Sequence, residues 1–317
     1  MLDLRGKKIV VTGGAGFIGS NIVEELLNHN CGEIIVIDDL SSGKIENIMP
    51  FSNKISFVKG CITDLDLLTD IFKGADYILH QAAIPSIPRS IQDPHRTNHV
   101  NVGGTLNVFL AARENNVKRV IYATSSSTYG NAEKLPVSED LPLNPLSPYA
   151  SQKMIGEMYG KIFYEVYGLE TVGLKYFNVF GSRQDPHSQY SAVIPIFIKK
   201  ISKGERPFIY GDGSTSRDFT YVKNVVNANL LACFSPEASG HVINVSAGNR
   251  VSLNELVNKI NECLGTNVEP EYLDFRKGEV LHSQADITKA KKIIGYDPEI
   301  SFEEGLIKTI EYYKNIL

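Results

Sequence analysis

The chain has 317 residues, of which 32 are basic and 36 acidic, so its formal net charge is -4. These charges are interspersed and form no basic stripe, which argues against nucleic acid or an anionic membrane as a partner. No segment approaches the length of a membrane span, and the four cysteines form no CxxC pair. We therefore expect a soluble, cytoplasmic protein with free thiols and, since its histidines show no metal-ligand pattern, no metal.

In the first half of the chain, short β-branched runs alternate with amphipathic segments. We predict strands at Lys8–Thr12, Glu33–Asp38, Ile55–Val58, Tyr77–His80, Val120–Thr124 and Thr171–Tyr176, and helices at Phe17–His29, Leu65–Phe72, Asn101–Asn115 and Tyr149–Tyr167. Such alternation is typical of βαβ units. It predicts an α/β fold of the Rossmann type, with a doubly wound parallel sheet covered by helices on both faces.

After Phe177 the pattern loosens into segments interrupted by glycine and proline, with helices predicted at Leu253–Leu264 and Phe302–Tyr313. We therefore predict a Rossmann domain over residues 1–177 and a smaller, mixed α/β domain over residues 178–317. Segments around residues 219–245 look like core and are expected to return to the first domain.

A glycine-rich motif, TGGAGFIG at residues 12–19, follows the first predicted strand and opens the first predicted helix. Its glycines permit a tight turn and let backbone amides approach a pyrophosphate at the helix N-terminus. Asp38, followed by Asp39, closes the second predicted strand. A carboxylate there accepts the ribose hydroxyls of NAD and repels the extra phosphate of NADP, so the cofactor is predicted to be NAD.

Tyr149 and Lys153 are four residues apart and share one face of a predicted helix. Ser147 is a suitable N-cap for this helix, and Pro148 suits its first turn. An ammonium group beside a phenol, with the positive nicotinamide nearby, favours the phenolate. Tyr149 is therefore a candidate general base, with a pKa expected to move towards neutrality.

A serine-rich segment, SSSTYG at residues 125–130, follows a strand at the edge where open α/β sheets bind ligands. A serine hydroxyl there can bridge a reacting hydroxyl of a substrate and the tyrosine. With TGGAGFIG, HQAA at residues 80–83, SSSTYG and YxxxK in this order, the chain resembles the extended short-chain dehydrogenase/reductase family, and within it the NAD-dependent nucleotide-sugar epimerases.

The resemblance implies that Tyr149 is the base, Lys153 its partner on the nicotinamide ribose and Ser125 the catalytic serine. It also implies a set of residues that bind NAD: Gly13, Gly16, Phe17, Ile18, Gly19, Asp38, Asp39, Ser42, Gly43, Cys61, Ile62, Gln81, Ala82, Ala83, Tyr149, Lys153 and Tyr176. The family often has an acidic residue after the third strand to hold the adenine. Because this chain has Cys61 there, we expect adenine recognition to rely more on the backbone.

Dehydratases and decarboxylases of this family place an acid just before the Tyr-Gly pair, where this chain has Ser126 and Ser127. A hydroxyl is a poor substitute for a carboxylate, so elimination is disfavoured. What remains is oxidation of the sugar at C4, movement of the 4-keto sugar to present its other face, and return of the same hydride. Tyr149 would take the hydroxyl proton and then return it.

The second half is similar to that of UDP-N-acetylglucosamine 4-epimerases, notably in YFNVFGSRQDP at residues 176–186. Arg217 and Arg276 are placed like the family's diphosphate-binding arginines. The planar guanidinium group of an arginine can donate two parallel hydrogen bonds to phosphate oxygens. Ser283 stands where epimerases restricted to glucose and galactose carry a bulky tyrosine, which leaves room for a 2-acetamido group. The resemblance thus implies a substrate set: Ser86, Ser126, Asn178, Gln184, Ala192, Val193, Tyr210, Arg217, Arg276 and Ser283.

The sequence predicts interconversion of UDP-GlcNAc and UDP-GalNAc, with the non-acetylated pair or uronic forms as further substrates. Two alternatives within enzymes are a UDP-glucose/UDP-galactose 4-epimerase and a net reductase that releases its cofactor. A catalytically silent nucleotide sensor on the same fold is a third alternative. The resemblance also implies a homodimer, because segments 101–115 and 149–167 resemble the pair that relatives use for a four-helix contact.

Overall fold

The computed structural model describes residues 3–132, 134–186, 192–275, 281–314 and 316. Within these residues lies a seven-stranded sheet in the order β11-β6-β5-β4-β1-β2-β3. Every neighbouring pair is parallel. The strands are β1 (Lys8–Thr12), β2 (Glu33–Asp38), β3 (Ser56–Lys59), β4 (Tyr77–His80), β5 (Arg119–Ser125), β6 (Glu170–Tyr176) and β11 (Val242–Val245). The predicted doubly wound Rossmann-type fold is confirmed.

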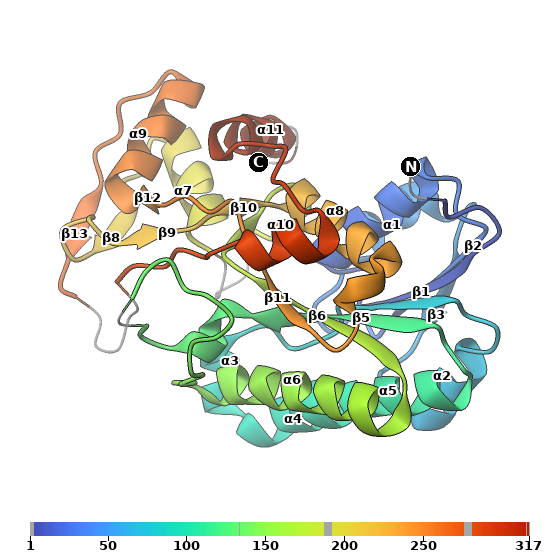
Figure 1. The fold of residues 1–317 in the computed structure, drawn as a ribbon. Helices are drawn as coiled ribbons and strands as arrows, with labels where there is room; N and C mark the ends of the chain where they lie inside the picture. The colour runs from blue at the N-terminus through green and yellow to red at the C-terminus, as the bar shows by residue number, and fades with distance from the viewer. Residues whose placement is uncertain (1–2, 133, 187–191, 276–280, 315, 317) are drawn as a thin grey trace.

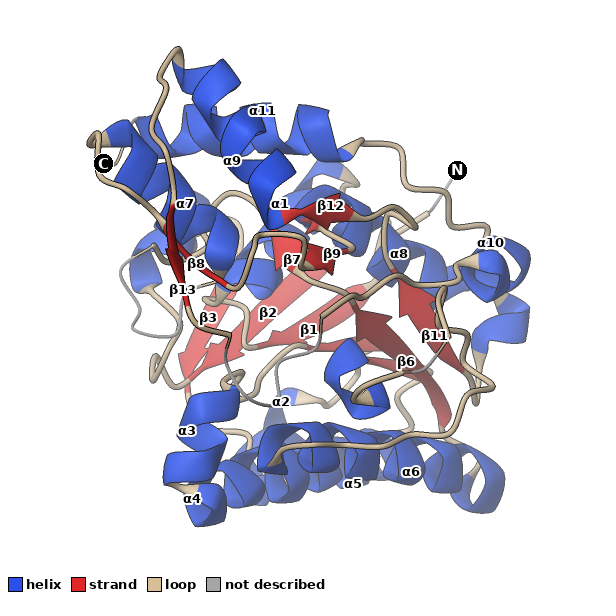
Figure 2. Ribbon diagram, turned by 90° about the vertical axis from the view of Figure 1, so that its left-hand side faces the viewer, coloured by secondary structure: helices blue, strands red, loops and turns tan. Residues whose placement is uncertain are grey.

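Helices cover both faces of this sheet (Figures 1 and 2). One face carries α1 (Phe17–Asn28) and α8 (Val222–Phe234), and the other carries α2 (Leu65–Ile71), α5 (Thr105–Glu114) and α6 (Pro148–Tyr167). The predicted helix over residues 101–115 is split, because its first turns form a π-helix, η3 (His99–Gly104).

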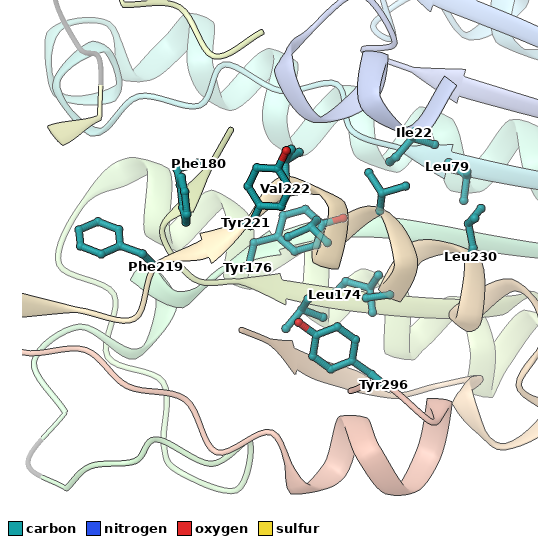
Figure 3. Close-up of a cluster of buried hydrophobic side chains, with 14 of the residues drawn as sticks. Ile22, Leu79, Leu174, Tyr176, Phe180, Phe219, Tyr221, Val222, Leu230 and Tyr296 are labelled. Atoms are coloured by element: carbon teal, nitrogen blue, oxygen red, sulfur yellow. The ribbon is translucent and has the colours of Figure 1, made fainter. Parts of the chain in front are cut away.

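The two faces are packed by alternate residues of the same strands, as the two-residue repeat of a strand requires. In β1, Ile9 and Val11 are buried in a core with α1 and α8, whereas Val10 is buried in the core on the opposite face. Figure 3 shows part of the larger core, in which Ile22 of α1 and Leu79 of β4 lie near Leu230 of α8. Each such side chain stabilises the fold by about 2 kcal/mol on burial.

Short elements fill the connections on the side of the sheet where the strands end. They are η1 (Ile45–Asn47), η2 (Met49–Phe51), α3 (Ile87–Gln92), α4 (Pro94–Asn98) and η4 (Ser126–Tyr129). Pattern reading did not predict α3 or α4, because each is too short to show a helical repeat. Both begin with a polar cap followed by proline: Ser86 accepts the Arg89 amide proton, and Asp93 accepts that of Arg96.

The second half of the chain adds small paired strands and helices beside the sheet. They are β7 (Val179–Phe180), α7 (Val193–Ser202), β8 (Phe208–Tyr210), β9 (Ser216–Arg217), β10 (Thr220–Tyr221), η5 (Pro236–Ala238), β12 (Val251–Ser252), α9 (Leu253–Leu264), β13 (Glu271–Leu273), α10 (Thr288–Ile294) and α11 (Phe302–Lys314). From segment 219–245, α8 packs on α1 and β11 pairs with β6. The domain boundary at residue 177 stays a prediction.

Parallel pairing brings the carboxyl ends of the central strands to one edge of the sheet. Thr12 of β1 lies beside Ile37 and His80, and Ser125 of β5 lies beside Tyr176 of β6. The residues that follow these strand ends therefore meet, although they are far apart in the sequence. In the described part of the chain, no helix is long and apolar enough to cross a membrane.

Candidate active site

Two glycines, one in the turn after β1 and one in the first turn of α1, have no room for a side chain. Gly13 has φ +68°, and a Cβ there would lie 2.6 Å from the amide nitrogen of Ala82. A Cβ on Gly19 would lie 2.2 Å from the carbonyl oxygen of Gly13. The turn therefore brings bare backbone to the N-terminus of α1, an arrangement that suits an anionic diphosphate.

Asp38 lies at the end of β2 beside this turn, and it is 7% exposed. Its carboxylate accepts hydrogen bonds from the amides of Ala15 at 3.0 Å and Leu40 at 2.9 Å. Burial raises the pKa of Asp38, and these amide donors oppose that rise. Gly43 packs directly on the carboxylate, since a Cβ at Gly43 would lie 2.8 Å from both carboxylate oxygens.

A cleft runs from this turn along the strand ends to Lys153. The predicted cofactor residues that line it are Gly13, Gly16, Phe17, Ile18, Gly19, Asp38, Asp39, Ser42, Cys61, Ile62, Gln81, Ala82, Ala83, Tyr149, Lys153 and Tyr176; Gly43 is not among its lining residues. The cleft is also lined by residues that were not predicted: Ile37, Ser41, Gly60, Ile84, Pro85, Val100, Ala123 and Thr124. All but Val100 lie within two positions of a predicted residue in the sequence. The motifs that predicted their neighbours could therefore also have predicted these residues.

A second cleft adjoins the first, and Tyr149 and Tyr176 line both. It contains six of the predicted substrate residues: Ser86, Ser126, Asn178, Ala192, Arg217 and Ser283. Most of the other residues that line this cleft were not predicted to bind substrate. They are Pro85, Ile87, Pro88, Ser127, Tyr129, Gly130, Ala132, Val137, Leu146, Ser147, Phe177, Ile196 and His282. Many of these come from the short α3 and from loops, where the sequence shows no periodic pattern.

Four predicted substrate residues are not placed in this cleft. The Gln184 side chain turns away and donates to the carbonyl oxygen of Val179 at 3.1 Å. Val193 is the first residue of α7, and Tyr210 ends β8, which pairs with β13. Arg276 lies outside the described residues.

The N-terminus of α6 positions Tyr149. Ser147 accepts the amide proton of Ala150 at 3.2 Å, Pro148 occupies the first turn, and Gly168 closes the helix with φ +71°. Ser90 of α3 also accepts the amide proton of Tyr149, at 3.0 Å. The base candidate is thus fixed by a cap and by a neighbouring helix.

Burial raises the pKa of Tyr149 to about 12, and the hydrogen bond between the Tyr149 and Ser125 hydroxyls acts in the opposite direction. The Lys153 ammonium, itself buried, donates to the carbonyl oxygen of Ala123 at 2.9 Å. Burial lowers the pKa of Lys153 to about 8. In the protein by itself, burial of the phenol outweighs the Ser125 hydrogen bond. The expected shift of the Tyr149 pKa towards neutrality, which includes the positive nicotinamide, stays a prediction.

Ser125 is held by its own segment. Its Oγ accepts hydrogen bonds from the amide of Ser127 at 3.2 Å and from the Ser127 hydroxyl at 2.9 Å. Together with Ser126, these side chains present hydroxyls, and no carboxylate, to the second cleft at this position.

The far wall of the second cleft is a hydrogen-bonded unit. The Asn178 amide nitrogen donates to Ser283 Oγ at 3.1 Å and to the Asp218 carbonyl oxygen at 3.2 Å. The Arg217 guanidinium donates to the carbonyl oxygens of Ser216 and Leu281 at 3.1 and 3.0 Å. Among the described residues, no group of three or more His, Cys, Asp or Glu side chains could hold a metal ion.

Comparison with known proteins decides the family. The sequence profile of the NAD-dependent epimerase/dehydratase family matches residues 9–246. The chain belongs to this family. It is 40% identical over 313 residues to a UDP-glucose 4-epimerase of Mycolicibacterium smegmatis, a match that covers 97% of this chain and 99% of the relative.

Solved structures of epimerases share the whole fold. A UDP-N-acetylglucosamine 4-epimerase from Methanobrevibacter ruminantium M1, in complex with UDP-N-acetylmuramic acid, matches with a TM-score of 0.94 and 43% identity, over 99% of this chain and all of that one. A UDP-glucose 4-epimerase from Thermotoga maritima, with UDP-glucose, matches with a TM-score of 0.92 and 38% identity, over 97% of this chain and 99% of that one.

Membership of the NAD-dependent epimerase/dehydratase family confirms the prediction of NAD as the cofactor. The relatives named above are 4-epimerases of UDP-sugars, in agreement with the predicted enzyme class, an isomerase. The chain's own residues fit NAD. The glycines at position 13, in the turn, and position 19, in α1, leave space for a diphosphate beside the backbone, and Asp38 stands at the strand end where a ribose would lie.

Proposed function

We propose that this chain catalyses the NAD-dependent 4-epimerisation of a UDP-hexose, and that its substrates are UDP-GlcNAc and UDP-GalNAc. The observation that carries the proposal is the meeting of the two clefts at Tyr149, where the described residues that line the second cleft include hydroxyl groups and no carboxylate. A sugar carbon in the second cleft faces the cofactor cleft across the base candidate. Because no carboxylate among the described residues lines the second cleft, the site favours transfer of a hydride and a proton over elimination.

Tyr149 and Ser125 handle the proton in this proposal. Tyr149 takes the proton of the C4 hydroxyl as the C4 hydride leaves, and Ser125, hydrogen bonded to Tyr149, holds the same hydroxyl. When held by the residues of the first cleft, NAD would supply the acceptor and donor of the hydride, and the positive charge of its nicotinamide would favour the phenolate of Tyr149. When the 4-keto sugar presents its other face, Tyr149 returns the proton and the product has the opposite configuration at C4.

The second cleft offers room for the sugar to turn. Small side chains form much of its wall beside Tyr149, including Ser126, Gly130, Ala132 and Ala192. Arg217 reaches the same cleft with a guanidinium suited to a diphosphate. A substrate held mainly by its UDP group can then rotate about the diphosphate while its sugar remains near Tyr149.

The preference for 2-acetamido sugars is supported by the wall at Ser283. This serine is hydrogen bonded to Asn178 and leaves open the volume that a tyrosine would occupy. The structural match with a UDP-N-acetylglucosamine 4-epimerase supports the same preference. A larger residue at position 283 would fill the space beside the sugar, so Ser283→Tyr should reduce turnover of UDP-GlcNAc more than that of UDP-glucose.

A direct experiment tests the proposal. The purified protein is incubated separately with UDP-GlcNAc, UDP-glucose and UDP-glucuronate, with no added reductant, and the product sugars are identified by NMR. We expect UDP-GalNAc to form fastest. Turnover of UDP-glucose alone would contradict the acetamido preference, and an absolute requirement for added NADH would contradict epimerisation in favour of net reduction.

We also propose a homodimer that forms through α5 and α6. The outer face of α6 exposes Met158, Ile162 and Val166, which lie one turn apart and form a continuous stripe. Tyr167 extends this stripe and lies under the Arg113 guanidinium of α5, 4.4 Å from the ring centre. An exposed apolar stripe on α6, bordered by Arg113 of the adjacent α5, is a surface that a second copy would bury.

A further inference from the structure

One buried carboxylate lies behind the catalytic residues. Glu157 is four residues after Lys153 on α6, so both side chains lie on the same face of the helix. Glu157 is 8% exposed and lies against the ends of β5 and β6. A charged side chain with so little solvent costs stability unless its partners compensate it, so its contacts indicate what the protein gains from it.

Glu157 connects three elements of the site. It accepts a hydrogen bond from the hydroxyl of Thr124 on β5, and it pairs with the ammonium of Lys175 on β6 at 3.2 Å. Thr124 stands between Ala123, whose carbonyl oxygen accepts the Lys153 proton, and Ser125, the partner of Tyr149. One carboxylate therefore fixes the strand end that carries both contacts of the catalytic pair.

The surroundings contain few other charges that could balance Lys153. His80 of β4 lies between the hydroxyls of Thr12 and Thr105, at 2.7 and 3.1 Å, and burial lowers its pKa to about 3, so the ring is neutral. Burial raises the pKa of Tyr122 and Tyr129, so both phenols are neutral. Lys175 lies 4.0 Å above the Tyr129 ring. Among the described residues, the charges of Glu139 and Lys289 also act electrostatically on Lys175.

We propose that Glu157 is a positioning residue of the epimerase, the counter-ion that keeps Lys153 cationic and seated on the Ala123 carbonyl. This role rests on the proposed function, in which a cationic Lys153 supports the Tyr149 phenolate. Because Lys175 neutralises part of the Glu157 charge, the three groups form a cluster that carries one net positive charge, next to Tyr149.

The direction of the electrostatic effects agrees with this role. Burial lowers the pKa of Lys153 to about 8, and the Glu157 carboxylate raises it. Removal of that carboxylate would lower the pKa of Lys153 further, into the range where the enzyme works. Since the ammonium form is the active one, activity would then be lost at a lower pH as the pH rises.

The test compares two isosteric variants of glutamates that contact the same pair of strands, β5 and β6. Glu157→Gln removes the charge but retains an oxygen for the Thr124 hydroxyl. Glu170→Gln is the matched control, because Glu170 pairs with the buried Arg119 at the opposite end of β5 and β6. In protein labelled at the lysine side chains and purified with its cofactor, the Lys153 resonance, assigned with Lys153→Arg, is titrated by NMR.

We expect Glu157→Gln to lower the pKa of Lys153 by about one pH unit, a tenfold change in proton affinity, and Glu170→Gln to leave it unchanged. The high-pH limit of kcat for epimerisation should move down by the same amount. An unchanged Lys153 pKa in Glu157→Gln would overturn the proposal. A wild-type enzyme that fails to epimerise any UDP-sugar would instead refute the proposed function, whereas the titration would still report on Glu157.

Glu157→Gln leaves Lys175 buried without its partner, which can prevent folding. The double variant Glu157→Gln, Lys175→Met removes both charges of the pair and keeps the volume of the long side chain. We expect it to fold and to have a Lys153 pKa below that of the single variant Lys175→Met, which shares the loss of the Lys175 charge. If the Lys153 pKa is the same in these two variants, Glu157 has no electrostatic role and the proposal is wrong.

Discussion

The residues to which we assign chemical roles in this site are of two kinds. Tyr149, Lys153 and Ser125 belong to short motifs whose spacing alone predicts a shared helix face and a strand end, and the structure brings them together at the junction of the clefts. Glu157 and Lys175 are 18 positions apart, and they meet only because α6 packs across β6. No local pattern could predict that pair, since its partnership depends on tertiary packing.

Tyr149→Phe tests the role of the phenol at this scale. The variant retains the ring but has no proton to exchange, so we expect kcat to fall by about 10²- to 10⁴-fold while NAD binding is retained. Tyr164→Phe on the same helix is the control, because Tyr164 is exposed on α6 and far from the clefts. Initial rates from NMR or a coupled assay, with bound NAD measured in parallel, distinguish the two; equal rates for both variants would contradict the assignment.

Gly13→Ala tests the cofactor turn. A methyl group there would collide with the Ala82 backbone, and the residue would also keep φ +68°. We expect at least a tenfold loss of NAD affinity, measured by calorimetry on protein stripped of cofactor. Gly265→Ala has nearly the same φ, +66°, with nothing within 4 Å of the added carbon, so it should lose stability and keep its NAD affinity. Unaltered NAD binding by Gly13→Ala would show that the turn does not hold the diphosphate.

At the scale of elements, the sequence predicted best the helices that carry their own boundary signals. The bounds of α9 match the predicted Leu253–Leu264, where Ser252 and Glu255 form a capping box and Gly265 adopts φ +66°. The π-helix at His99–Gly104 was missed because its sequence continues the apolar pattern of α5. This π-helix continues directly from α4 and packs against α6.

Two N-cap variants separate stability from catalysis. Ser252→Ala removes the capping box of α9, and Ser147→Ala removes the cap of α6; each should lower the free energy of unfolding by about 1 kcal/mol. Only Ser147→Ala should also lower kcat, because Tyr149 lies in the first turn of α6. Urea unfolding and initial rates measure both effects. An equal fall in kcat for Ser252→Ala and Ser147→Ala would contradict the claim that only the cap of α6 affects catalysis.

For the molecule as a whole, the βα alternation was enough to predict the parallel sheet, but it could not place the last strand. β11 joins the sheet beside β6 after a long excursion through β7 to β10 and α8. Its four residues, Val242–Val245, are apolar enough to predict a core segment. The sequence does not show that they pair with β6, because this pairing depends on β6 having an open edge in the folded sheet. The residues that line the second cleft could likewise not be predicted, because they come from loops that are far apart in the sequence and meet only in the fold.

The proposed dimer makes a prediction for the assembly. Ile162→Glu places a charge in the middle of the exposed stripe on α6, so we expect the variant to be monomeric in light scattering while it remains folded. Ile307→Glu on α11 is the control, because Ile307 is also exposed but lies on a different helix. A wild-type protein that is itself a monomer at micromolar concentration would exclude the proposed interface.

In the proposed epimerisation, the hydride that leaves the sugar C4 returns to the same carbon. The most direct measurement uses UDP-GlcNAc that carries deuterium at C4, incubated with the purified enzyme in ordinary water without added cofactor. The product UDP-GalNAc, analysed by NMR and mass spectrometry, should retain the deuterium at C4. Replacement of the deuterium by protium from water would contradict the account, because it would require the C4 hydrogen to leave as a proton.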